Sequence, residues 1–123
     1  MDTMNAVERM GALAHPRRLA VFRLLVQAGP SGLAAGEVAR AMDCPPNTLS
    51  TQLAILSRVG LVDARREGRS IIYTAGFDAV GELIGFLMQD CCGGRPEVCA
   101  PVLEAAACCA PASRVPETTG DLP

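Results

Sequence analysis

The feature that most constrains the fold is a pair of prolines between two short segments with helical apolar spacing. Residues 36–42 are helix-prone, and the helix cannot continue through the segment 43–46, because proline lacks an amide donor and disfavours helical geometry in the residue before it. Pro46 suits the first turn of a following helix, where its missing donor would be unpaired anyway. The segment 47–60 has apolar residues at helical spacing and a glycine at its end. The sequence therefore predicts a helix, a tight turn and a second helix whose buried face holds Leu49, Leu53 and Leu56.

The other face of this second helix begins with short, uncharged side chains that form hydrogen bonds. A DNA recognition helix places side chains of this kind against base edges in the major groove. Taken alone, the pattern also fits an ordinary helix hairpin with a polar outer face. The candidate base-reading residues are Asn47, Thr48, Ser50, Thr51 and Gln52, with Arg58 near the end of the same helix.

A basic hairpin is predicted directly after this helix. Residues 61–73 alternate as two short strands around a turn at Glu67-Gly68. A basic hairpin in this place is typical of the wing of a winged helix, which contacts phosphates or the minor groove. A solvated surface hairpin is the alternative for the arginines alone. The candidate DNA contacts in the wing are Arg65, Arg66 and Arg69.

Three further helices are expected, over residues 3–14, 17–27 and 77–90, with Thr3 or Asn5 capping the first. His15 is the only histidine, and we interpret it as a residue that satisfies nearby backbone at a helix entrance rather than as a ligand. The last helix has a broad apolar stripe that packs either within the monomer or against another helix. The stripe consists of Val80, Leu83, Ile84, Leu87 and Met88.

Charge is divided unevenly along the chain. The net charge is −2, but residues 1–76 hold nine arginines and six acids, whereas residues 77–123 hold two arginines and seven acids. The candidate DNA-binding part is therefore the basic part. The N-terminus does not resemble a secretory signal and no apolar run reaches membrane-spanning length, so we expect a cytoplasmic protein with no membrane partner. In that compartment, six cysteines are ligands or redox groups rather than structural disulfides.

Three of these cysteines follow the last apolar helix within nine residues. Gly93-Gly94 should end the helix and let the chain fold back, which would bring Cys99 beside Cys91 and Cys92. Trivalent arsenic bonds three sulfurs in a trigonal pyramid, whereas zinc prefers four ligands. Three thiolates without histidine therefore suit As(III) or Sb(III) better than zinc. Cys108 and Cys109 form a possible second pair.

The sequence resembles the ArsR/SmtB family of metal- and metalloid-sensing bacterial repressors. The matching segments are 14–19, 49–56 with 59–62, and 65–73, and the resemblance covers roughly residues 5–90. Gln52 stands where many members have histidine, so the base preference need not match theirs. The resemblance implies a mainly helical winged helix-turn-helix with a small β-hairpin. It also implies a homodimer, formed by the first and last helices, that reads an inverted repeat in double-stranded operator DNA.

We therefore predict three regions, namely a DNA-binding and dimerisation domain (1–90), a cysteine-rich metalloid-binding segment (91–109) and a disordered tail (110–123). The predicted function is a repressor, not an enzyme, that leaves its operator when As(III) or Sb(III) binds Cys91, Cys92 and Cys99. One alternative keeps the fold and senses redox state or reactive sulfur. Two others are a small thiol reductase, which the absence of a Cys-x-x-Cys motif disfavours, and a DNA-binding architectural protein without a ligand.

Overall fold

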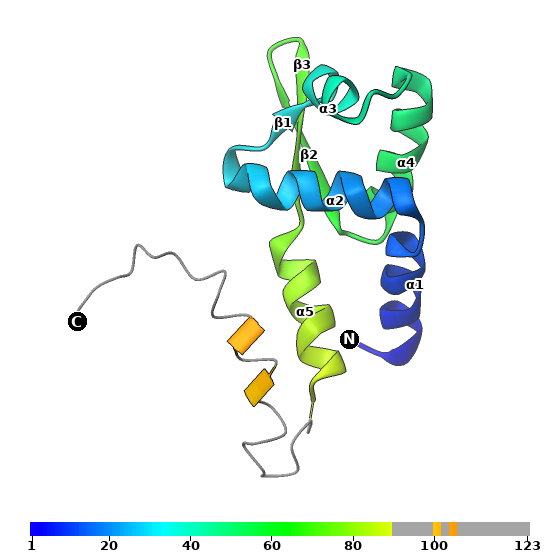
Figure 1. Ribbon diagram of the computed structural model, residues 1–123, viewed down its shortest axis with the longest axis vertical. Helices are drawn as coiled ribbons and strands as arrows, with labels where there is room; N and C mark the ends of the chain where they lie inside the picture. Colours follow the sequence, from blue (N-terminus) through cyan, green and yellow to red (C-terminus); the bar gives the residue numbers. More distant parts are fainter. Residues whose placement is uncertain (90–99, 102–103, 106–123) are drawn as a thin grey trace, which may run out of the picture. The chain divides into compact units, whose positions relative to one another are not determined.

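The computed structural model describes residues 1–89, 100–101 and 104–105. The chain divides into two compact units, residues 1–87 and 88–123, and the first unit contains all the helices and strands named below (Figure 1). It is mainly helical with one small antiparallel sheet, as the sequence predicts. In chain order the elements are α1 (Thr3–Leu13), α2 (Pro16–Ala28), a 3₁₀ turn η1 (Gly29–Ser31), β1 (Leu33–Ala34), α3 (Ala35–Met42), α4 (Pro46–Arg58), β2 (Val62–Glu67), β3 (Ser70–Ala75) and α5 (Phe77–Leu87).

The sheet has three strands in the order β1-β3-β2. The hairpin of β2 and β3 was predicted, but its turn lies one residue later than expected, because Glu67 still pairs with Ser70. Gly68 has a φ of 63° and is followed by a residue with negative φ, an arrangement typical of a type II′ turn. The strand β1 was not predicted. It has only two residues and exists because Leu33 pairs with Tyr73 across the sheet.

The helix-turn-helix forms where the prolines place it. Helix α3 ends at Met42, and Asp43 adopts the left-handed conformation with a φ of 51°. Pro45 then caps α4 and Pro46 occupies its first turn. Because the backbone carbonyl of Pro45 accepts a hydrogen bond from the Leu49 amide at 3.0 Å, the turn leads directly into the recognition helix.

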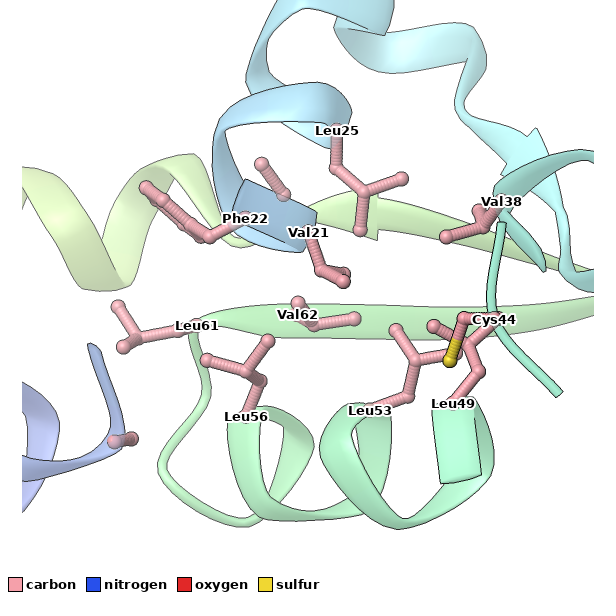
Figure 2. Packing of buried hydrophobic residues seen from close by; sticks show 12 residues of the cluster. Val21, Phe22, Leu25, Val38, Cys44, Leu49, Leu53, Leu56, Leu61 and Val62 are labelled. Carbon is pink, nitrogen blue, oxygen red and sulfur yellow. The ribbon is translucent and has the colours of Figure 1, made fainter. Parts of the chain in front are cut away.

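The core lies between α2, α4 and the sheet. Figure 2 shows the three predicted leucines of α4 pointing toward Val62 and α2, and they are at most 2% exposed. Helix α2 contributes Val21, Phe22 and Leu25 to this core, whereas its Leu19 and Val26 are exposed. The core leucines of α4 are Leu49, Leu53 and Leu56.

Several helix ends and one helix cap differ from those expected. Asp2 caps α1, with its Oδ1 accepting from the Asn5 amide at 2.8 Å, so neither Thr3 nor Asn5 is the cap. Helix α5 ends at Leu87 rather than at residue 90. His15 caps α2 through its Nδ1, which accepts from the Arg17 amide at 3.1 Å. This bond agrees with the prediction that His15 satisfies nearby backbone groups. Among the described residues, the helices are too short or too polar to cross a bilayer.

Candidate nucleic-acid interface

The outward face of α4 is polar and exposed over most of its length. Thr48 and Gln52 are half-buried, whereas the other candidate residues are exposed. The side-chain oxygen of Asn47 accepts from the Thr48 amide at 2.9 Å, and the Thr51 hydroxyl donates to the Asn47 carbonyl at 3.2 Å. These local bonds use the side-chain oxygen and the backbone carbonyl of Asn47, and they leave its side-chain nitrogen (Nδ2) as a free donor. The exposed candidate residues of α4 are Asn47, Ser50, Thr51 and Arg58.

Gln52 lies at the edge of the buried face and is held by Arg18 from α2. The Nη1 of Arg18 donates to the Gln52 Oε1 at 3.2 Å, and the Nε donates to the Ala12 carbonyl at 2.6 Å. Gln52 also lines an open hollow of about 550 Å³ together with His15 and Arg17. The role of Arg18 was not predicted, because residues 34 positions apart show no local pattern that reveals their contact.

The three arginines of the wing are not equivalent. The Arg65 side chain is fixed by two hydrogen bonds within the chain. Its Nε donates to Glu67 at 2.6 Å and its Nη2 donates to the Ser31 carbonyl at 3.0 Å. The side chains of Arg66 and Arg69 are exposed and form no hydrogen bond or ion pair with the described residues. Two of the three predicted contacts are therefore unengaged and available to phosphates.

A second surface lies on α1 and α5, which we call the α1–α5 apolar surface. Arg9 holds the two helices together, since its Nη1 donates to the Ala79 carbonyl at 2.8 Å and to Glu82 at 3.0 Å. Both helices nevertheless expose large apolar side chains, which are 40–65% accessible. The surface comprises Met4, Val7, Met10, Phe77, Ile84 and Leu87.

The predicted apolar stripe of α5 is thus divided. Leu83 is buried and Val80 packs against the core, whereas Ile84 and Leu87 are 52% and 53% exposed. Met88, just after the helix, is half-buried. Packing within the monomer therefore accounts for only part of the stripe.

The predicted thiol ligands lie outside the described residues: Cys91, Cys92, Cys99, Cys108 and Cys109. Cys44 is described. It is buried in the helix-turn-helix, and its sulfur accepts from the Arg17 Nη1 at 3.3 Å. Within the described ranges, no three histidine, cysteine or acidic side chains are close enough together to hold a metal ion.

Comparisons with known proteins agree with this geometry. A helix-turn-helix domain model matches residues 13–65. The HTH-type transcriptional regulator YgaV of Escherichia coli is 31% identical over 88 residues, which are 72% of this chain and 87% of YgaV. HlyU of Vibrio cholerae, a solved structure, has a TM-score of 0.59 and 31% identity, with coverage of 72% of this chain and 96% of HlyU.

A further solved structure is the homodimeric winged helix-turn-helix domain of Mb0332 from Mycobacterium bovis, described as a possible ArsR-family regulator. Its TM-score is 0.57 at 32% identity, over 68% of this chain and 75% of that one. A polar recognition helix followed by a basic two-stranded wing defines the class of winged helix DNA-binding proteins. Within that class, the chain belongs to the family of winged helix-turn-helix transcriptional regulators.

Proposed function

We propose that this regulator is a homodimeric repressor that binds an inverted-repeat operator and is released by trivalent arsenic or antimony. The observation that carries the proposal is the place of the first thiols in the sequence, shortly after a helix that contributes to the α1–α5 apolar surface. Leu87, the last residue of α5, belongs to that surface, and Cys91 follows it after three residues. In this proposal, a ligand bound by these thiols acts on the helix that joins the two copies.

The dimer supplies the specificity that one small domain lacks. In the proposed dimer, a twofold axis through the α1–α5 apolar surface relates the two copies, and the similar domain of Mb0332 is also described as homodimeric. The two α4 helices then enter successive major grooves, about 34 Å apart. Arg66 and Arg69 of each copy contact the flanking phosphates.

The proposed inducer site consists of the thiolates of Cys91, Cys92 and Cys99. Trivalent arsenic exchanges its hydroxyl groups for three soft sulfur ligands, and this donor set without histidine fits such an ion better than zinc. If the two recognition helices of the liganded dimer are spaced wrongly for the operator, ligand binding shifts the dimers from the DNA-bound to the free state. A coupling free energy of about 1–3 kcal/mol is typical of such a switch.

A thiol redox or reactive-sulfur sensor of the same fold is the second candidate. The similar solved structures include one described as reduced HlyU from Vibrio cholerae, at 29% identity and a TM-score of 0.57. Adjacent thiols such as Cys91-Cys92 and Cys108-Cys109 are oxidised readily when their thiolates are exposed. This candidate predicts release by a mild oxidant and reversal by dithiothreitol, without any metalloid.

The deciding experiment is fluorescence anisotropy of the labelled promoter fragment bound to fully reduced protein, titrated with arsenite. We expect release near one arsenic per monomer. Serine at Cys91, Cys92 or Cys99 should preserve operator binding and abolish release, whereas Cys44→Ala, far from this cluster in sequence, should respond like the wild type. Stable binding in excess arsenite followed by release with oxidant would favour the redox sensor, and no specific DNA binding would contradict both.

A further inference from the structure

One guanidinium joins three elements of the domain. Arg18 is in the first turn of α2, and its Nε donates to the carbonyl of Ala12 at 2.6 Å, near the C-terminal end of α1. Its Nη2 lies 3.4 Å from the Gly11 carbonyl, and its Nη1 reaches Gln52 on α4 at 3.2 Å. Figure 1 shows the junction of α1 and α2 lying beside α4. Arg18 therefore satisfies carbonyls at the end of α1 and holds a side chain of the recognition helix.

The chemistry of this contact fixes the orientation of the Gln52 amide. A guanidinium has only donors, so the atom of Gln52 that faces Arg18 must be the oxygen rather than the nitrogen. The two N–H donors of the amide then point away from Arg18. Because three separate groups of the guanidinium are engaged, Arg18 has little freedom to release Gln52.

We propose that Arg18 is a specificity-determining positioning residue that makes Gln52 present its amide nitrogen, and not its oxygen, to the operator. The proposal rests on the proposed DNA-reading role of α4. Arg18 acts through Gln52 and contacts no base itself.

The consequence for base choice follows from the edges of the bases. A free glutamine pairs with adenine through both ends of its amide, donating to N7 and accepting from N6. When the oxygen is turned toward Arg18, Gln52 offers its two N–H donors instead, and these match the N7 and O6 acceptors of guanine. Cytosine presents a donor in the major groove and is disfavoured. Gln52 in this chain should therefore select guanine over adenine.

Selection from a randomised duplex library by the reduced, full-length protein tests this role without any inducer. We expect the wild type to enrich guanine at one symmetric pair of positions, and Gln52→Ala to lose the preference there only. Arg18→Met should shift that pair toward adenine by about tenfold, since one good base contact supplies at least this discrimination. Arg23→Met is the matched control, because Arg23 is an exposed arginine of α2 without a side-chain hydrogen bond to the described residues.

A second variant keeps the test valid if Arg18→Met lowers the thermal stability. Gln52→Glu retains a partner for Arg18 but removes both amide donors, so it should move the preference of the same pair toward cytosine. A profile of Arg18→Met that equals the wild type, or that changes at positions other than those of Gln52, would overturn the role of Arg18 alone. Failure of the wild type to enrich any sequence would overturn the DNA-reading function as well.

Discussion

Truncation of the α1–α5 apolar surface should separate the dimer without unfolding the monomer. Full burial of a leucine or isoleucine side chain is worth about 1.5–3 kcal/mol. Ile84 and Leu87 are 52% and 53% exposed, so about 1 kcal/mol per side chain remains to be gained on association. Each side chain occurs twice in a twofold interface, so the two residues together contribute about 4 kcal/mol. The Cβ of alanine retains part of this contribution. The double variant Ile84→Ala/Leu87→Ala should therefore lose about 3 kcal/mol and weaken the dimer roughly hundredfold.

Sedimentation equilibrium over a range of protein concentrations measures this dissociation constant, and far-UV circular dichroism checks that the helices persist. The matched control is Ile71→Ala, an exposed isoleucine (37%) on the wing strand β3. It should leave the dimer constant unchanged because it lies outside the α1–α5 apolar surface. An unchanged constant in the double variant, or equal weakening in the control, would refute the assignment of this surface to the dimer.

Two other predictions concern the wing and the junction before α5. Arg66→Gln and Arg69→Gln should each lower the slope of log K against log salt by about 2 per dimer, one for each lost phosphate contact, in anisotropy titrations with KCl. Arg65→Gln should change it less, because Arg65 already bonds to the hairpin and η1. Gly76→Ala should cost about 1–3 kcal/mol in thermal unfolding, because its Cβ would collide with the backbone carbonyl of Gly60; full wild-type stability would contradict this packing.

The helix-turn-helix was predictable because its signals are local. Leu49, Leu53 and Leu56 repeat within one helix, and Pro45-Pro46 restrict the backbone without help from distant residues. The hairpin was predictable for the same reason, and its turn was displaced by only one residue. Local spacing therefore defines these elements even in a chain with few aromatic residues.

The missed contacts between elements depend on partners far along the chain. The strand β1 forms because Leu33 meets Tyr73, 40 residues away. Likewise, the charge pattern treats Arg65 and Arg66 alike, although only Arg65 has a carbonyl partner, on Ser31. Helical spacing identifies an apolar face on α5, but it does not reveal that Leu83 is covered by the same chain while Ile84 is not. Such distinctions require the tertiary contacts themselves.

The contacts of α1 suggest how the proposed inducer signal reaches the DNA-reading helix. Arg9 fixes the middle of α1 to Ala79 and Glu82 of α5, and Arg18 joins the last turn of α1 to α4. An 11-residue helix is about 16 Å long and stiff, so it transmits a displacement as a rigid body. The Arg9 side chain is 17% exposed, which makes its partly buried bond to the Ala79 carbonyl harder for water to replace than a surface pair, whereas Glu82 is 61% exposed. A ligand that shifts α5 against its partner copy would therefore also shift α1, and through Arg18 it would alter the position of α4.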